Sequence, residues 1–409
     1  MGAHLPVLLC VLLSICSSHS ISCLDDEGNP VEWFVGYKFP DSYKYAYIQP
    51  GSNGWKVSDH SINKSGMLRR TFELMYSLRN SSDGIYGMYN DAKPQLHTVH
   101  DVWWGHMKGA FAFQLPATGF WIIHSIPKLS QKPDTYSFPE SGHVYGQHFS
   151  CFSLNGSDLN KIVTQLIISR PLFQDTYVSS AIANEYPDLK LLLENKKVAT
   201  NLSNVQHFAS RNGSLQMLHF SKSVAYGKDL YASLVAPRLG FALNVETWRH
   251  AEEGGNEPSY CEAKHLWVLN IQSLQFRGLN ISFPNFADHA KWATTIMPID
   301  GGKSTKMWIC LGDINRQFSQ FRRGGGTMCI QSEAIWTVFN DLIVKRENCK
   351  TPPKSRVFGS YQSGSMETIV WDICYRRVSG TYSFVKNLID YLFYTLEPVE
   401  ISSPSSPPF

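Results

Sequence analysis

Several features are missing from this 409-residue sequence, and each absence excludes a class of protein. No two cysteines are spaced as Cys-x-x-Cys, which excludes zinc-ribbon and thioredoxin-type motifs. Residues 21–349 contain no glycine–serine linker, heptad repeat or low-complexity segment, so they do not form a string of tethered modules. Charged residues make up only 17%, and the net charge of +3 is too small to identify a nucleic-acid-binding protein by itself.

The apolar run at the N-terminus, LPVLLCVLLSIC (5–16), is too short to span a bilayer. The small-residue stretch SSHS follows it, and this order is typical of a secretory signal peptide. We therefore expect residues 1–20 to be a signal peptide that is cleaved after Ser20, although no Lys or Arg precedes the run. Six Asn-x-Ser sequons agree with passage through the secretory pathway to a lysosome or out of the cell: Asn63, Asn80, Asn155, Asn201, Asn212 and Asn280.

Seven of the nine cysteines lie beyond the predicted signal peptide. In the oxidising secretory pathway this odd number predicts three disulfides and one remaining thiol. Spacing alone leaves the pairing open. The seven are Cys23, Cys151, Cys261, Cys310, Cys329, Cys349 and Cys374.

Apolar and aromatic residues are plentiful. They reach 43% and 13% of the chain, which predicts a globular protein with a large core. The sequence also has 14 histidines, and these add positive charge near pH 5. This balance suits a polyanionic substrate in an acidic compartment, and it equally suits a histidine-rich protein with no connection to acid.

Short apolar stretches alternate with helical periodicity along the chain. We expect strands within 32–39, 119–126, 265–274 and 306–312, and helices at 67–80 and 333–345. The mixture predicts an α/β (α+β) sandwich.

The tail after residue 349 differs in composition. TPPKSRVFGSYQSGS (351–365) has the composition of a linker, and SSPSSPPF (402–409) that of a disordered end. Between them, SFVKNLIDYLFYTL (383–396) predicts an amphipathic helix that is too short and polar to cross a membrane.

Two short motifs share the spacing His-x-Lys. His106 and Lys108 begin HMKGAFAF (106–113), and His289 and Lys291 lie in DHAKW (288–292). In an extended strand, residues i and i+2 face the same side, so each pair is expected to project together.

A second apolar strand follows each motif and ends in a polar residue. His124 stands three residues after Trp121, and Asp313 stands five residues after Trp308. Since both separations are odd, we predict the same strand phase between tryptophan and polar residue in each half.

Two such pairs have the chemistry to cleave a phosphodiester. One neutral imidazole attacks phosphorus, while the other, protonated, donates to the leaving oxygen. Two lysines neutralise the phosphoryl oxygens without a metal. Asp313 is expected to orient one ring, with His124 or Asn315 sharing that positioning. Which histidine attacks stays open, and a single His-x-Lys would mark only a solvated strand edge.

The histidine-rich stretch before the first motif has two interpretations. His97, His100 and Asp101, with His106, supply enough donors for a metal site, or they form a polar loop that leads into a strand. Their spacing matches no established metal motif.

Aromatic and basic residues near the motifs are also ambiguous. Trp103 and Trp104 either stack on bases or pack in the core or at its rim. The segment RQFSQFRRGGG carries three arginines suited either to phosphate contacts or to a solvated glycine turn: Arg316, Arg322 and Arg323.

From residue 22 to residue 349 the sequence resembles the deoxyribonuclease II family, acid endonucleases related to the phospholipase D superfamily. The resemblance rests on segments that follow the family's order: SCLDDEGNPVEWFVGYKFP, MYNDAKP, GHMKG, GFWIIHSIP, YSFPESGHVYGQHFSC, DLYASLVAP, DHAKW, CLGDINR and RGGGTMC. Met107 stands where the family usually has threonine, and Ala293 stands where some members have cysteine.

The resemblance implies a pseudo-symmetric αββα sandwich. Two phospholipase D-like halves, at about 21–190 and 191–349, would meet at one active site, and 350–409 would be an extension. The implied activity is cleavage of double-stranded DNA at acid pH without a metal or other cofactor, through a phosphohistidine, to 3′-phosphate and 5′-hydroxyl ends. No membrane association is expected, and the oligomeric state is left open.

Residue by residue, the resemblance assigns the catalytic core to His106, Lys108, His289 and Lys291. It assigns supporting roles to His124, Asp313 and Asn315. It also implies the disulfides Cys23–Cys151, Cys261–Cys349 and Cys310–Cys329, which leaves Cys374 over.

Two other functions compete with DNA cleavage. A secreted relative that binds DNA or a protein partner without cutting would be signalled by loss of a catalytic histidine or lysine, and none is lost here. A phospholipase is disfavoured because no lipid-facing amphipathic segment stands out.

Overall fold

The computed structural model describes residues 20–91, 104–130, 132–198, 200–251, 255–259, 261, 266–297, 306–347 and 349. These residues belong to the first of two compact units, Met1–Pro352 and Pro353–Phe409. The predicted signal peptide up to residue 19, the tail with its expected helix at 383–396, and Cys374 lie outside the described residues.

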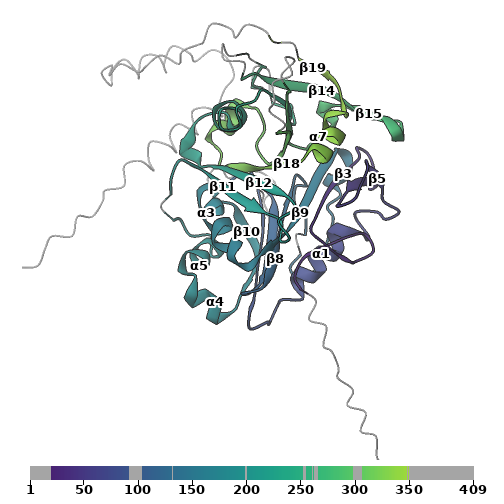
Figure 1. The fold of residues 1–409 in the computed structure, drawn as a ribbon. Helices are drawn as coiled ribbons and strands as arrows, with labels where there is room; N and C mark the ends of the chain where they lie inside the picture. Colours follow the sequence, from purple (N-terminus) through teal and green to yellow (C-terminus); the bar gives the residue numbers. More distant parts are fainter. Residues whose placement is uncertain are drawn as a thin grey trace, which may run out of the picture. The chain divides into compact units, whose positions relative to one another are not determined.

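The first half of the described unit forms an eight-stranded antiparallel sheet (Figure 1). Its strand order is β10-β6-β7-β8-β9-β3-β4-β5. The strands are β3 (Trp33–Lys38), β4 (Tyr45–Ile48), β5 (Lys56–Val57), β6 (Gly84–Asn90), β7 (Gly109–Gln114), β8 (Thr118–His124), β9 (Gln147–Asn155) and β10 (Leu172–Val178). A separate two-stranded ribbon pairs β1 (Cys23–Leu24) with β2 (Pro30–Val31).

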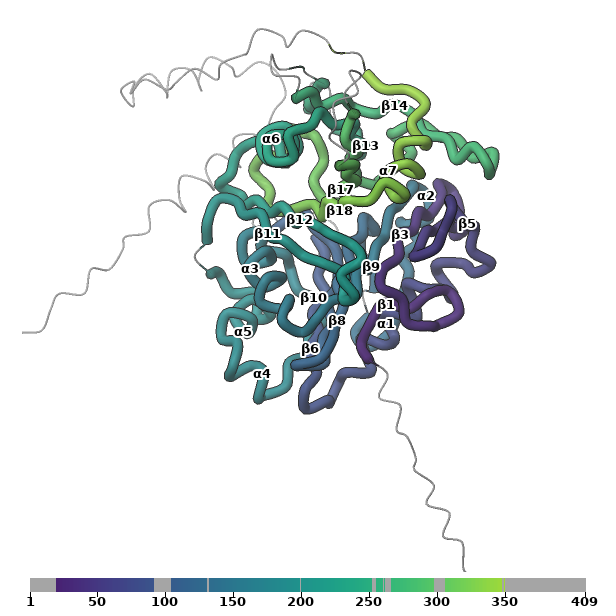
Figure 2. The backbone as a smooth tube through the Cα atoms, viewed as in Figure 1, coloured from purple at the N-terminus to yellow at the C-terminus, as the bar shows by residue number. Residues whose placement is uncertain are grey.

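The second half forms a nine-stranded sheet in which only β13 and β14 pair in parallel. Its order is β11-β12-β18-β17-β16-β13-β14-β15, and β19 also pairs with β14. The strands are β11 (Ser203–Ala209), β12 (Gln216–Lys222), β13 (Leu243–Glu246), β14 (Val268–Phe276), β15 (Ile281–Pro284), β16 (Trp292–Thr295), β17 (Trp308–Gly312), β18 (Gly325–Gln331) and β19 (Ile343–Arg346). Figure 2 separates the blue strands of the first sheet from the green strands β13, β17 and β18 of the second.

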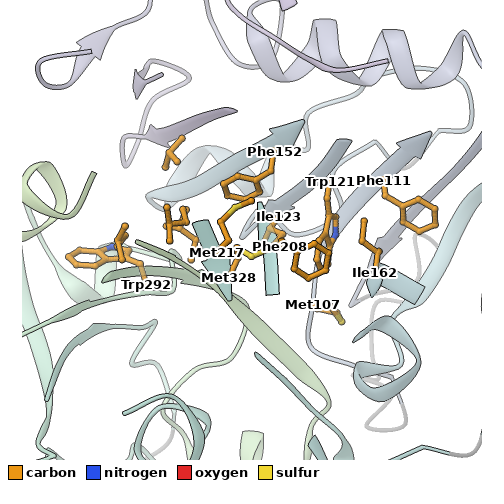
Figure 3. Packing of buried hydrophobic residues seen from close by; sticks show 14 of the residues in the cluster. Met107, Phe111, Trp121, Ile123, Phe152, Ile162, Phe208, Met217, Trp292 and Met328 are labelled. Atoms are coloured by element: carbon orange, nitrogen blue, oxygen red, sulfur yellow. The ribbon is translucent and has the colours of Figure 1, made fainter. Parts of the chain in front are cut away.

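The main core lies between the two sheets. Alternate residues of each strand point into it, and Figure 3 shows Trp121 and Phe152 of the first sheet close to Phe208, Met217 and Met328 of the second. Burial of each such side chain stabilises the fold by about 1.5–3 kcal/mol, so the interface between the halves is the largest source of stability.

Helices cover the outer faces of both sheets. α1 (Met67–Tyr76) packs Phe72 and Met75 against the first sheet, and η3 (Tyr231–Val235) with α6 (Ala236–Leu239) packs against the second. The described unit is therefore an α/β sandwich with two central sheets between helices, as the sequence predicted.

Two longer helices lie at the seam between the sheets. α3 (Leu159–Ser169) and α7 (Glu333–Asn340) both contribute to the core between the sheets. The shorter helical segments are α2 (Ser141–Val144), α4 (Ser180–Glu185), α5 (Pro187–Leu193), η1 (Gly156–Asp158), η2 (Val224–Tyr226), η4 (Arg277–Leu279), η5 (Asn285–Ala287) and η6 (Phe318–Arg322).

The predicted elements match β3, β8, β14, β17 and α1, but the helix expected at 333–345 is too long. α7 begins where the Ser332 side chain caps the Ile335 N–H, and it ends at Asn340. Residues 343–346 instead form β19, because the edge of β14 offers backbone partners that the helix period did not reveal.

The two sheets repeat one local arrangement around the His-x-Lys motifs. The residue after Lys108 is Gly109, which pairs with Ile123, and the residue after Lys291 is Trp292, which pairs with Leu311. Ile123 and Leu311 are therefore corresponding positions in the two halves.

This correspondence corrects the predicted strand phase. Since Ile123 corresponds to Leu311, the residue that corresponds to Asp313 is Ser125 and not His124. The two tryptophans do not correspond either, because they stand at different distances before these positions. The odd separations from Trp121 to His124 and from Trp308 to Asp313 therefore do not reflect equivalent positions in the two halves.

Three disulfides brace the unit, and they are the pairings that the family resemblance implied. Cys23–Cys151 ties the N-terminal ribbon to β9, Cys310–Cys329 links neighbouring strands β17 and β18, and Cys261–Cys349 joins a loop to the end of the unit. Such crosslinks stabilise a fold mainly by restricting the unfolded chain.

The predicted glycosylation sites lie mostly at the surface. Five sequon asparagines are exposed, while Asn63 is half-buried. No helix among the described residues is long and apolar enough to cross a membrane.

Candidate active site

The two His-x-Lys motifs lie directly before β7 and β16. Their middle residues, Met107 and Ala290, are buried in the core between the sheets, and Figure 3 shows Met107 there. The histidines and lysines consequently face away from that core. β7 starts at Gly109, after the motif that was predicted to lie in the strand. The backbone N–H of His106 instead donates to the carbonyl of Gly324 in the other half (2.8 Å).

Each imidazole is held by a backbone carbonyl of the opposite half. Nδ1 of His106 lies 2.7 Å from the carbonyl oxygen of Asp313, and Nδ1 of His289 lies 2.8 Å from that of Ser125. Ser125 and Asp313 are corresponding residues, so the contact is reciprocal. Because a carbonyl only accepts, these contacts favour the hydrogen on Nδ1 of each ring and leave the lone pair on Nε2.

The two lysines are buried beside these rings. Nζ of Lys108 contacts Oδ2 of Asp91 at 2.7 Å, and Nζ of Lys291 donates to the carbonyl of His289 and lies 3.1 Å from Nδ1 of the same residue. Burial and the charge of Lys108 lower the pKa of Lys291 well below its ordinary value. The two lysines are therefore close enough for the charge of one to act on the other, and an anion near both would be stabilised.

Asp91 is a site residue that the sequence reasoning missed. Its Oδ2 lies 3.4 Å from Nε2 of His106, and its Oδ1 has no hydrogen-bond partner among the described residues. Burial raises the pKa of Asp91, but Lys108 and then Arg323 lower it below its ordinary value overall, so Asp91 is a carboxylate. Asp91 directly follows the buried strand β6, which pairs with the strand after the motif, but a single aspartate after a strand does not indicate its partners.

The second half has an indole where the first has this carboxylate. Tyr89 of β6 pairs with Gly109, and Glu246 of β13 pairs with Trp292, so the residues two positions further, Asp91 and Trp248, correspond. The ring centroid of Trp248 lies 4.8 Å from that of His289, in an edge contact. The two imidazoles therefore have equivalent backbone partners and different side-chain neighbours.

The supporting residues lie at the site, but not all act as predicted. The backbone oxygen of Asp313, and not its carboxylate, contacts the imidazole, while Oδ1 accepts from the Lys108 N–H at 3.1 Å. Burial raises the pKa of Asp313 to about 8, so its carboxyl is neutral at acid pH. Asn315 accepts the backbone N–H of Trp248 (3.1 Å) and so positions that side chain.

Two further histidines lie behind the motifs. The His124 N–H donates to the carbonyl of Lys108 (3.2 Å), and its Nδ1 accepts from the Ile126 N–H (3.2 Å), which fixes its ring. Nε2 of His148, which the sequence reasoning did not single out, lies 2.9 Å from the carbonyl of Gly312 and joins the two halves.

Burial and positive charge act on both motif histidines. Burial first, and then the nearby lysines, lower the pKa of His106 and His289 well below the ordinary value. A phosphate placed between the lysines would offset their charge and make protonation of one ring easier.

The prediction that Arg316 contacts DNA is wrong. The residue is fully buried, Nη1 donates to Oδ1 of Asn270 at 2.6 Å, and Nε lies 3.5 Å from Oδ2 of Asp229. These partners hold its guanidinium inside the second half, where a phosphate cannot reach it.

The other two arginines have different surroundings. Arg323 is also largely buried, and Nε donates to the carbonyl of Trp104 at 3.0 Å. Only Arg322 is exposed, so it alone stays a simple candidate for a phosphate contact. Trp104 itself is half-buried beneath the guanidinium of Arg170 at 4.7 Å.

The alternative metal site remains a sequence-based hypothesis. His97, His100, Asp101 and Trp103 lie outside the described residues. Within the described part of the chain, no three histidine, cysteine, aspartate or glutamate side chains are grouped as metal ligands.

Comparison with known proteins agrees with this geometry. The family model for deoxyribonuclease II matches residues 22–349. Deoxyribonuclease-2-alpha of Mus musculus is 30% identical over 361 residues, which are 85% of this chain and 99% of the relative. Cell death-related nuclease 6 of Caenorhabditis elegans is 32% identical (84% and 93%), and plancitoxin-1 of Acanthaster planci is 30% identical (84% and 96%). The chain therefore belongs to the deoxyribonuclease II family.

Proposed function

We propose that this protein is an endodeoxyribonuclease that cleaves phosphodiester bonds of double-stranded DNA at acid pH without a metal. The observation that carries the proposal is the reciprocal contact of His106 and His289 with carbonyls of the opposite half, beside two buried lysines. The charge of His106 acts on the pKa of His289, and that of Lys108 on the pKa of Lys291. This proximity supports phosphoryl transfer through a histidine at one shared site.

The proposed reaction has two steps. The lone pair of one Nε2 attacks phosphorus, the bond to the 5′ oxygen breaks, and the other imidazole gives its Nε2 proton to that oxygen. A water then attacks the phosphohistidine and loses a proton to the second imidazole, which restores both rings. The products are a 3′-phosphate and a 5′-hydroxyl.

The neighbours of the two rings favour different roles for them. Both nitrogens of His106 face acceptors, the Asp313 carbonyl and the Asp91 carboxylate, and this favours a proton on each nitrogen. His289 has an acceptor at Nδ1 and an indole beside its ring. We therefore assign His106 as the proton donor and His289 as the nucleophile.

The same electrostatics supports activity at acid pH. Because burial and the lysines depress the pKa of His106, its second proton is available only in acid, even after a phosphate offsets part of the positive charge. Activity is expected to fall as pH rises from about 5 to 7, with loss of one proton.

The compartment belongs to the same proposal. Three disulfides and five exposed sequon asparagines suit the secretory pathway, and an acidic lysosome or a secreted pool would both provide the required chemistry.

Nicking of supercoiled plasmid at about pH 5 in EDTA tests the proposal. We expect cleavage in EDTA and none with His106→Ala, with 3′-phosphate ends that a 3′-phosphatase removes. Abolition of cleavage by the chelator contradicts a metal-free reaction. Binding of plasmid with no cleavage at any pH identifies a DNA-binding relative that does not cut.

A further inference from the structure

Four aromatic rings line the His289 side of the proposed site, and the reaction steps do not use them. We call Tyr145, Trp248, His250 and Phe286 the aromatic rim. The rings of Trp248 and His250 stack with centroids 4.7 Å apart, and Tyr145 lies 5.6 Å from Trp248. Phe286 lies 6.4 Å from His250.

The aromatic rim borders the reacting imidazole. Trp248 contacts the His289 ring at 4.8 Å, and Tyr145 lies 6.5 Å from it. A nucleotide whose phosphate reaches Nε2 of His289 would therefore bring its sugar and base next to these rings.

The aromatic rim is open to solvent at its outer side. Phe286 is 58% exposed and His250 is exposed, while Tyr145 and Trp248 are half-buried. A cluster formed only for core packing would bury these rings, so their exposure beside a catalytic group indicates a binding surface.

The rings are also held in place before any ligand arrives. The Gly146 N–H donates to the carbonyl of Ala287 (2.9 Å), which ties the loop of Tyr145 to the segment before His289. Oδ1 of Asn315 accepts the backbone N–H of Trp248, and Nε2 of Gln317 donates to the backbone carbonyl of Trp248 at 2.9 Å, so both bonds fix the backbone that carries this ring. A surface fixed in this way loses little conformational entropy on binding.

Among the described residues, the first half has a carboxylate at the position that corresponds to the indole of the aromatic rim. Asp91 stands where Trp248 stands in the second half, and the charges of Lys108 and Arg323 act on it. In the part of the chain that the structure describes, the site therefore has a carboxylate beside His106 and the aromatic rim beside His289. A DNA strand that crosses it meets different chemistry before and after the scissile phosphate.

We propose that the aromatic rim is a nucleobase subsite. It binds the base of the nucleotide that keeps the 3′-phosphate once that base has left the duplex stack, by stacking on Trp248 and His250 with Phe286 at the outer edge. Stacking suits any base, because every base presents a π face, so this subsite would add affinity without strict sequence preference. The inference rests on the proposed function, since it places the scissile phosphate at His289.

An oligonucleotide with one abasic nucleotide tests the subsite. Cleavage at the phosphodiester 3′ of a tetrahydrofuran residue is compared, as kcat/KM at about pH 5 in EDTA, with cleavage at the same position carrying thymine. We expect a base-to-abasic ratio of about ten for the unchanged protein, a typical contribution of stacking on one base.

Substitutions in the aromatic rim should lower the base-to-abasic ratio of kcat/KM. Trp248→Ala is expected to bring it close to one, Phe286→Ala to reduce it about threefold, and Trp248→Phe to restore most of it. Val344→Ala, an exposed apolar residue (53%) on β19, is the control and should leave the ratio at ten. Because the readout is a ratio, a general loss of activity by a variant does not affect it.

Two results would overturn the subsite: a ratio of one in the unchanged protein, or an unchanged ratio in Trp248→Ala and Phe286→Ala. Binding of the same two oligonucleotides, followed by fluorescence anisotropy, separates this failure from failure of the proposed function. A protein that cuts neither but binds the thymine form more tightly, through Trp248, retains the subsite and loses the nuclease.

Discussion

In the first half of the described unit, a carboxylate lies beside the histidine of the His-x-Lys motif, and in the second half an indole occupies the corresponding position. The backbone around the two histidines is nearly the same, since each ring bonds a carbonyl of the opposite half. The comparison shows that a repeated arrangement gives two imidazoles equivalent backbone partners and different side-chain neighbours, and we propose that Asp91 and Trp248 thereby give them different roles.

The residues behind the motifs differ as well. Tyr89 in the first half corresponds to Glu246 in the second, and Glu246 is fully buried. Neither carboxylate oxygen of Glu246 has a hydrogen-bond partner among the described residues. We therefore expect the stability of the protein to respond to protonation of this acid.

The two histidines themselves are the largest test of the comparison. His106→Ala and His289→Ala are each expected to lower cleavage of plasmid by about 10³-fold or more, because each removes one of two proton-transfer or nucleophilic partners. With a p-nitrophenyl phosphodiester, whose leaving group needs no proton, His106→Ala should release a burst of about one p-nitrophenolate per protein molecule, because only hydrolysis of the phosphohistidine then lacks its base, and His289→Ala should release none. The opposite pattern would exchange the two roles, and full activity of either variant would refute a shared site.

Two buried lysines offer a test of stability. Lys38 and Lys222 occupy corresponding strand positions, and burial lowers the pKa of each to about 7. Nζ of Lys222 donates to three carbonyls in the loop before β18, and Nζ of Lys38 to one before β9.

Removal of these donors should therefore affect the halves unequally. We expect Lys222→Met to lower the free energy of unfolding by about 3 kcal/mol and Lys38→Met by about 1 kcal/mol, since buried carbonyls without donors are costly. Urea denaturation at pH 5 measures both. Equal losses would mean that the three carbonyls find other donors.

Asp91→Asn tests the carboxylate that distinguishes the first half. The variant removes a charge that stabilises protonated His106, so it should lower activity about 10- to 100-fold and move the loss of activity to lower pH. Trp248→Phe, at the corresponding position, should leave the pH profile unchanged. The measurement is the pH dependence of kcat/KM. An unchanged pH dependence in Asp91→Asn would contradict the proposal that Asp91 stabilises protonated His106.

The smallest expected effect concerns Glu246. Burial and then Asp288 raise its pKa well above the ordinary value, so the folded protein binds this proton more tightly than the unfolded chain. The free energy of unfolding should therefore fall as pH rises above about 4.3 towards the folded pKa. In Glu246→Gln this decline should be smaller by about 1–2 kcal/mol between pH 4.5 and 7.5, as measured by denaturation at both pH values. If the free energy of unfolding falls equally in Glu246→Gln and in the unchanged protein, titratable groups other than Glu246 cause the fall.

Much of the site was predictable because its residues come in short local patterns. The spacing of His106 and Lys108, and its repeat at His289 and Lys291, indicated two pairs on one face, and the buried middle residues agree with that. Arg316 was mispredicted because a basic residue beside glycines has the same local pattern whether Asp229 buries it or solvent surrounds it. Asp91 was missed because a single aspartate after a strand carries no local sign of its partners.

By itself the sequence determined the class of fold, the strands that follow both motifs and the residues that we propose for the chemistry, because strand period and residue type are local properties. Only the tertiary structure decided that each imidazole bonds a carbonyl of the other half, that Ser125 and not His124 corresponds to Asp313, and that Asp91 and Trp248 face equivalent rings. These facts depend on the register between distant strands and on the packing of two sheets, which bring together residues about 200 positions apart.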